Sequence, residues 1–290
     1  MKRVLTFILL LAISSCSSPG ENEKIAIKNG DVNIAYNISG IGDTALLFVH
    51  GWCINKNYWQ KQEDYFDKRF KVISIDLGGH GQSGHNRNSW TVNDFAQDVV
   101  AVINRLKLNK IILVGHSMGG DIVLKVLNSI PEKIIGLVGI DNFKDVKTQF
   151  TPEEKEQINI FMQQLKSNFD SSATVYSKAT LFPPNYKDTI SINRVIKDIQ
   201  TSDSTVAYQA LESSLQSFLK EPEMLSQLKI PLYLIESDYI PVGEKALKKY
   251  CKAGYFISTI QGTGHYPMIE KPDEFNLALE ATLNKISDKK

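Results

Sequence analysis

A serine flanked by two glycines is the strongest candidate for chemistry in the sequence. Gly115, Ser117 and Gly119 follow the apolar, partly β-branched run at 111–114, and an apolar helical pattern continues over 121–127. A serine on a sharp turn between a buried strand and a helix exposes its hydroxyl, and the glycines allow the strand and the helix to approach closely. Such a hydroxyl attacks a carbonyl carbon once an adjacent base removes its proton.

Four motifs in this chain order resemble those of the α/β-hydrolase superfamily. They are the strand 45–49 ending in His50-Gly51-Trp52, the strand 71–75 leading into 76–83, the elbow 115–119, and Gly262-Thr-Gly-His265 followed by 270–276. The resemblance runs from about residue 24 to 286 and is weakest between about 145 and 228. It implies an α/β fold with a mostly parallel β-sheet flanked by helices. It also implies a helical cap inserted between strands 6 and 7.

The resemblance assigns roles to several residues. Ser117 takes the position of the nucleophile, and His265, in a glycine-rich loop after the last predicted strand, takes that of the base. The other four histidines are expected to pack and to hydrogen-bond the backbone (His50, His80, His85 and His116). The backbone N–H groups of Trp52, next to Gly51, and of Met118 are expected to form the oxyanion hole.

The acid of the expected triad is open between two aspartates. The sequence departs from the family's G-x-x-D turn after the strand that precedes the histidine, because this region reads Glu236-Ser237-Asp238. Asp238, which lies 27 residues before His265, is the favoured acid. Asp141, at the end of the strand 134–141, is the alternative, because some relatives carry their acid there. Either would orient the imidazole and stabilise the imidazolium.

The rest of the chain reads as one α/β domain with an insertion. Asn29-Gly30 between two strand-like segments predicts a hairpin. Strands and helices then alternate, which predicts βαβ units. The core is expected over 24–144 and 229–290, with the helical cap over 145–228. Thr151-Pro152-Glu153-Glu154 predicts a helix start in the cap, and further helices are expected near 191–200 and 204–220.

The N-terminus reads as a targeting segment. Lys2 and Arg3 precede a short apolar run, which predicts a signal peptide over 1–15. An apolar residue and two small ones before Cys16 resemble a bacterial lipobox, which implies cleavage before Cys16, its lipidation, and a tether over 16–23. We therefore expect a lipid-anchored protein of the bacterial cell envelope, facing the periplasm or the cell surface. The alternative is plain secretory cleavage near Ser15.

Charge and composition narrow the class of partner. With Lys+Arg 33 and Asp+Glu 32, the net charge of +1 gives no reason to expect nucleic acid as a partner. No cofactor and no metal site are expected, and the sequence leaves the oligomeric state open. Cys53 and Cys251 are expected to be free thiols.

The expected function is hydrolysis of a carboxylic ester through an acyl-enzyme. The same groups also hydrolyse lactones, thioesters or carbon–carbon bonds, or act as a cofactor-free perhydrolase. A noncatalytic binding or sensor protein with a retained site is the alternative of another class. The cap supplies apolar and aromatic residues that either line a pocket or pack the cap onto the core (Phe150, Phe161, Met162, Phe169, Tyr176, Phe182 and Tyr186). Because Lys155, Lys166 and Lys178 read as solvent-facing, the predicted substrate is a small neutral or apolar acyl compound.

Overall fold

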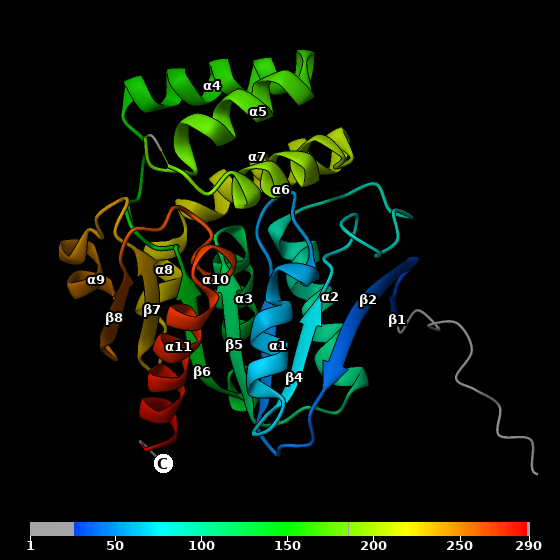
Figure 1. The fold of residues 1–290 in the computed structure, drawn as a ribbon, viewed down its shortest axis with the longest axis vertical. Coiled ribbons are helices and arrows are strands. Elements are labelled where there is room, and N and C mark those ends of the chain that lie inside the picture. Colours follow the sequence, from blue (N-terminus) through cyan, green and yellow to red (C-terminus); the bar gives the residue numbers. More distant parts are fainter. Residues whose placement is uncertain (1–25, 185, 289–290) are drawn as a thin grey trace, which may run out of the picture.

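The computed structural model describes residues 26–184 and 186–288 (Figure 1). The predicted signal peptide, the tether and Cys16 lie outside the described residues. The elements in chain order are β1 (Ala26–Asn29), β2 (Val32–Ser39), β3 (Ala45–Val49), the 3-10 turn η1 (Lys56–Trp59), α1 (Gln60–Phe66), β4 (Lys71–Ile75), α2 (Val92–Arg105), β5 (Ile111–His116), α3 (Met118–Ser129), the 3-10 turn η2 (Pro131–Lys133), β6 (Ile134–Ile140), α4 (Pro152–Ser167), α5 (Phe169–Thr180), α6 (Thr189–Gln200), α7 (Ser204–Phe218), α8 (Glu221–Ser226), β7 (Leu232–Ser237), α9 (Glu244–Tyr250), β8 (Tyr255–Ile260), α10 (Pro267–Glu270) and α11 (Pro272–Ser287).

The strands of the described residues form one sheet in the order β1-β2-β4-β3-β5-β6-β7-β8. β1 and β2 form the predicted antiparallel hairpin, in which Gly30 adopts a φ of +58° that a side chain would disfavour. β2 pairs antiparallel with β4, and every pair from β4 onward is parallel. The carboxyl ends of β5, β6, β7 and β8 therefore meet at one edge of the sheet. The expected mostly parallel α/β architecture is confirmed.

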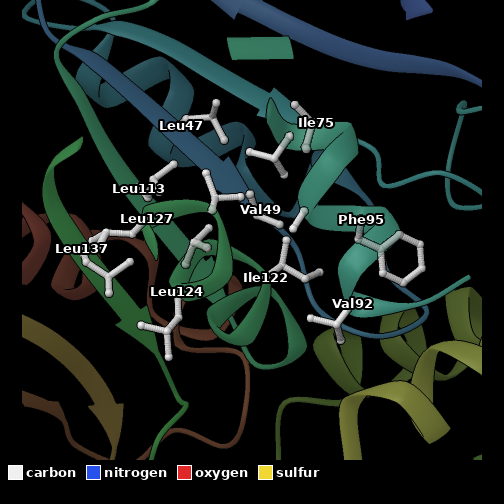
Figure 2. Packing of buried hydrophobic residues seen from close by; sticks show 14 of the residues in the cluster. Leu47, Val49, Ile75, Val92, Phe95, Leu113, Ile122, Leu124, Leu127 and Leu137 are labelled. Atoms are coloured by element: carbon white, nitrogen blue, oxygen red, sulfur yellow. The ribbon is translucent and has the colours of Figure 1, made fainter. Parts of the chain in front are cut away.

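Helices cover both faces of the sheet and bury its apolar side chains. α2 and α3 pack on one face with α8 and α9, and α1, α10 and α11 lie on the other face (Figure 1). The interior strands β3 and β5 are buried along their whole length, as a parallel strand covered on both faces requires. Figure 2 shows Leu47 and Leu113 of these strands against Ile122 and Leu124 of α3. This packing makes α3, and with it the turn before α3, a rigid support.

The segment between β6 and β7 forms a helical layer over the carboxyl edge of the sheet. α4 to α7 lie above this edge (Figure 1). The predicted capping box at Thr151 and Glu154 starts α4, and the helices expected near 191–200 and 204–220 are α6 and α7. The sequence reading missed α5, which Asn168 caps by accepting a hydrogen bond from the Ser171 N–H.

Polar contacts fix this helical layer to the core. The Trp52 indole N–H donates to the Ala207 carbonyl of α7 at 2.7 Å, and the Val92 N–H donates to the Ser213 hydroxyl at 3.0 Å. Cys53 and Cys251 are both buried free thiols. Over residues 26–184 and 186–288, no helix is long and apolar enough to cross a membrane.

Candidate active site

Ser117 lies on a strained turn between β5 and α3. Its backbone has φ 52° and ψ −124°, a conformation that costs free energy for a residue with a side chain. A Cβ atom added at Gly115 would come within 2.3 Å of the Gly119 carbonyl oxygen, and one at Gly119 within 2.5 Å of the Val49 carbonyl oxygen. The predicted close approach of strand and helix at these two glycines is therefore confirmed.

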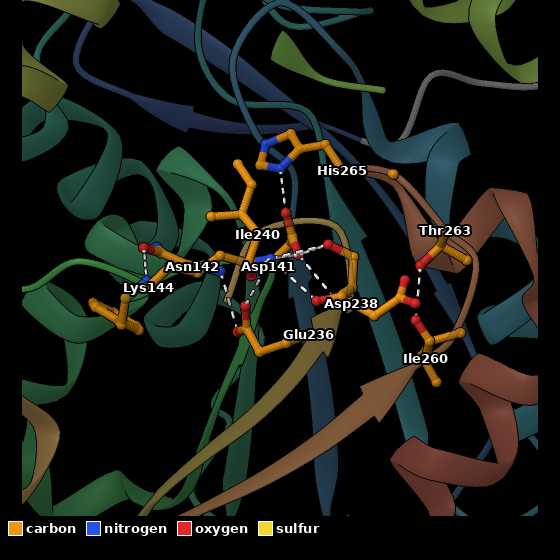
Figure 3. A network of polar contacts seen from close by, with 12 residues as sticks. Asp141, Asn142, Lys144, Glu236, Asp238, Ile240, Ile260, Thr263 and His265 are labelled. Atoms are coloured by element: carbon orange, nitrogen blue, oxygen red, sulfur yellow. Dashed lines mark hydrogen bonds and ion pairs between the residues drawn. The ribbon is translucent and has the colours of Figure 1, made fainter. Parts of the chain in front are cut away.

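His265 is held by both the core and the helical layer. Its Nδ1 atom lies 2.6 Å from Oδ2 of Asp141 (Figure 3), and its backbone N–H donates to the Leu181 carbonyl at 2.8 Å. The carboxylate at Nδ1 accepts the proton of that nitrogen, which leaves Nε2 as the basic nitrogen. The His265 side chain is 18% exposed and lines the same cavity as Ser117.

Asp141 directly follows β6 and lies beside the end of β7. Its φ is +47°, and its backbone N–H donates to the Ile235 carbonyl at 3.1 Å. Its Oδ1 atom accepts from the Ser237 N–H at 2.9 Å and from the Ser237 hydroxyl at 2.6 Å, and Lys144 Nζ lies 2.6 Å away. Oδ2 is therefore the oxygen that faces the imidazole.

The structure does not bring Asp238, the aspartate favoured from the sequence, to His265. Asp238 Oδ1 instead accepts from the Gly262 N–H at 2.8 Å, beside the turn of Ile260 and Thr263 (Figure 3). The preference for Asp238 was therefore wrong, and the alternative, Asp141, occupies the position. The physical reason is that β6 and β7 are parallel neighbours, so both strand ends lie near the histidine loop and sequence distance does not separate them.

Burial and charge set the protonation of the two buried acids. Burial raises the pKa of Asp141, but the hydrogen bond from His265 and the positive charges of His265 and Lys144 outweigh it, so the net pKa is well below its usual range. Burial also raises the pKa of Glu236 well above its ordinary value, and the charge of Asp141 adds to this rise. These surroundings therefore favour the ionised form of Asp141 and the protonated form of Glu236.

The cavity of Ser117 and His265 has a volume of about 380 Å³ and lies beneath the helical layer. Trp52 and Met118, whose N–H groups are the predicted oxyanion donors, both line it. Its lining is mainly apolar and aromatic (Trp52, Met118, Phe143, Tyr176, Leu181, Leu211, Phe218, Ile240 and Tyr266). Of the cap residues expected either to line a pocket or to pack, Tyr176 lines this cavity, whereas Met162, Phe169 and Phe182 are buried.

The sequence reading did not find the residues that support the site. The Asn142 side-chain amide donates to the Ser117 carbonyl at 2.6 Å, and Ser237 and Lys144 bind Asp141. The one available signal was the departure from G-x-x-D, because it left β7 without an acid at the expected place. His50 and His116 have the expected structural roles: His50 Nε2 accepts from the Leu77 N–H, and His116 Nε2 lies 2.7 Å from the His265 carbonyl oxygen.

Comparisons with known proteins agree with this architecture. The family model described as alpha/beta hydrolase fold matches residues 44–184. A Haemophilus influenzae protein named "Putative esterase/lipase" is 28% identical over 84% of this chain and 85% of its own length. The 3-oxoadipate enol-lactonase 2 of Acinetobacter baylyi is 24% identical over 89% of this chain and 95% of its own length.

The fold is shared with a solved esterase. The thermophilic esterase from Thermogutta terrifontis superposes with a TM-score of 0.77 at 22% identity, covering 90% of this chain and 98% of that one. The family model, these two relatives and the order of the strands agree. The chain therefore belongs to the α/β-hydrolase superfamily.

Proposed function

We propose that this protein is a serine esterase that hydrolyses neutral carboxylic esters through Ser117, His265 and Asp141. The observation that carries the proposal is the 2.6 Å contact between His265 Nδ1 and Asp141 Oδ2, in a cavity that Ser117 also lines. An oriented imidazole beside a serine on a strained elbow is the arrangement that activates a hydroxyl for acyl transfer.

The mechanism follows from these positions. His265 Nε2 accepts the Ser117 hydroxyl proton as the Ser117 oxygen attacks the ester carbonyl, and Asp141 stabilises the imidazolium that forms. The N–H groups of Trp52 and Met118 donate to the oxyanion. The imidazolium then gives its proton to the leaving alcohol, and water repeats the sequence on the acyl-enzyme to release the carboxylic acid.

The lining of the cavity supports a neutral substrate. Lys144 is the only lysine or arginine among the described lining residues, and its ammonium already contacts Asp141, Ser237 and the Ile240 carbonyl. A substrate carboxylate in this cavity would find no free cation, and burying an unpaired charge is costly.

Lactones are the second candidate substrates. The enol-lactonase of Acinetobacter baylyi matches 89% of this chain, and a lactone is a cyclic ester that the same groups would open. An acyl-enzyme formed from a lactone keeps its alcohol attached, so release of one hydroxy acid distinguishes the two substrate classes.

The test is labelling and turnover. A fluorophosphonate probe should label the protein at Ser117, and p-nitrophenyl acyl esters should be hydrolysed. Ser117→Ala should abolish labelling and reduce kcat by at least about 10⁴-fold, because only the binding and oxyanion contributions remain. Ser89→Ala, which removes an exposed hydroxyl on the loop before α2, is the matched control and should label as the wild type does. Substantial esterase activity in Ser117→Ala would refute the proposal.

A further inference from the structure

Lys144 is bound more extensively than a surface lysine would be. Its Nζ atom lies 2.6 Å from Asp141 Oδ1, 2.9 Å from the Ser237 hydroxyl, 3.0 Å from the Ile240 carbonyl oxygen and 3.6 Å from Glu236 Oε2 (Figure 3). Its side chain is 11% exposed, and it lines the cavity of Ser117. This lysine therefore connects the end of β6 with the end of β7 at the carboxylate that binds the base.

The contacts of Lys144 fix which oxygen of Asp141 faces His265. Oδ1 receives two donors from Ser237 in addition to the ammonium, whereas Oδ2 receives His265 alone. The backbone carbonyl of Lys144 also accepts from the Gly243 N–H at 2.6 Å, which fastens the loop after β7. Asp141 has a positive φ, so these contacts hold a strained residue in place.

We propose that Lys144 is a positioning residue of this active site, which orients Asp141 toward His265 and offsets the carboxylate charge that His265 experiences. The proposal rests on the proposed esterase function, since it assigns Asp141 as the partner of the base. Lys144 and His265 contact opposite oxygens of one carboxylate, so the ammonium opposes protonation of the imidazole.

Other titratable groups near His265 come from three further elements. Burial raises the pKa of Glu236, on β7, well above its ordinary value. His116, on β5, is neutral because burial lowers its pKa to about 3, and the proximity of His265 acts in the same direction. Glu270, on α10, accepts from the Gly264 and Tyr266 N–H groups, and burial raises its pKa.

Asp145 also lines the cavity, and it is paired with Lys147 at 2.6 Å. Of these groups, Glu236 also contacts Lys144, at 3.6 Å, so a substitution at Lys144 changes the surroundings of both Asp141 and Glu236. A comparison made in a Glu236→Gln background therefore reports the Asp141–Lys144 pair.

The experiment compares pH profiles of kcat/KM for a p-nitrophenyl ester. In Lys144→Met the carboxylate charge is unopposed, the imidazolium is more stable, and the acidic limb should move to higher pH by about one unit. Lys144→Arg retains the charge, so its acidic limb should coincide with that of the wild type. Lys147→Met removes a positive charge that binds Asp145 and Glu154 instead, and it should leave the limb in place.

A second measurement separates this proposal from the proposed function. An NMR pH titration of the His265 imidazole measures the pH midpoint of its protonation without any turnover of substrate. In Lys144→Met this midpoint should move in the same direction as the acidic limb. If the wild type hydrolyses no ester and labels with no fluorophosphonate, the proposed function fails, but the titration still tests the effect of Lys144. If the protein is an active esterase and both readouts of Lys144→Met coincide with those of the wild type, the positioning role is refuted.

A second variant tests the role of Lys144 even if Lys144→Met does not fold. Removing one partner of a buried ion pair leaves an uncompensated charge, so Lys144→Met could lose its fold. The double variant Glu236→Gln/Lys144→Met removes the second acid of the network and carries the same expected displacement, measured against Glu236→Gln. No displacement between those two proteins would overturn the proposal.

Discussion

Replacing Asp141 with asparagine exchanges one carboxylate oxygen for an amide NH₂. This change tests which groups donate and which accept hydrogen bonds around His265. Oδ1 of Asp141 is surrounded by donors from Ser237 and Lys144, so the amide oxygen of an asparagine must take that place. The amide NH₂ then occupies the place of Oδ2 and points at His265 Nδ1. Two donors cannot face each other, so His265 is forced to carry its proton on Nε2, toward Ser117.

The expected decrease in kcat follows from this change of tautomer. An imidazole protonated on Nε2 cannot accept the Ser117 proton, and its imidazolium loses the partner charge. The equivalent change in a well-studied serine protease lowers kcat by about 10⁴-fold, which corresponds to about 5 kcal/mol of transition-state stabilisation. We expect Asp141→Asn to lower kcat for a p-nitrophenyl ester by 10³- to 10⁴-fold, on the order of that precedent.

Asp238→Asn is the matched control for this prediction. Asp238 accepts one hydrogen bond, from the Gly262 N–H, and an asparagine oxygen accepts it equally well. Its kcat should therefore stay within about threefold of the wild type, as is usual for a surface change that breaks no buried contact. A large loss in Asp238→Asn with near-normal kcat in Asp141→Asn would show that the described geometry is not the one that reacts. If both variants kept near-normal kcat, Glu236 would be the next acid to test.

Three further predictions concern the substrate, the location and the stability. Neutral esters should have a higher kcat/KM than matched carboxylated esters because Lys144 is already paired, and a clear preference for the carboxylated ester would contradict this view of the cavity. If Cys16 is lipidated as proposed, the protein should be released from membranes by detergent but not by salt, and Cys16→Ser should be soluble or unprocessed; a wholly soluble wild type would leave the plain secretory signal. Burial raises the pKa of the interacting acids Asp121 and Glu221, so their protonated forms stabilise the fold fully below about pH 4 and this stability is lost as the pH rises through neutral. Between pH 5 and pH 8, the free energy of unfolding measured in urea should fall less for Glu221→Gln than for the wild type. Equal decreases would refute the interaction between Asp121 and Glu221.

The turn at Ser117 and the order of the elements could be predicted because local sequence determines them. The run before Gly115, the two glycines and the apolar helix pattern each fix a local conformation, and the structure has the strand, the strained turn and the helix there. The hairpin at Gly30 follows from local turn chemistry in the same way. Helix α5 was missed because its start depends on the Asn168 cap rather than on a strong apolar period.

The partner of His265 could not be predicted because it depends on contacts between segments far apart in the chain. Asp141 and His265 are separated by 124 residues, and Ser237, which fixes the orientation of Asp141, is 96 residues from it. Sequence spacing from the histidine favours Asp238, but the direction of a side chain after a strand depends on the backbone of the loop. Asp141 has a positive φ, and no pattern of residue types in the sequence predicts that conformation.

Residues at the ends of both β6 and β7 position the His265 imidazole. Ile140 and Ile235 are register partners in parallel strands, so the residues that follow them, Asp141 and Glu236, lie side by side. Of these two acids, only Asp141 has both the Ser237 donors and the ammonium of Lys144 to favour its ionised form, whereas burial raises the pKa of Glu236 well above its ordinary value. Ser237 lies at the end of β7, and its N–H and hydroxyl serve as donors to the carboxylate that follows the neighbouring strand. The His265 imidazole is therefore oriented by groups from two adjacent strands, because Asp141 follows β6 and the donors that fix Asp141 come from the end of β7.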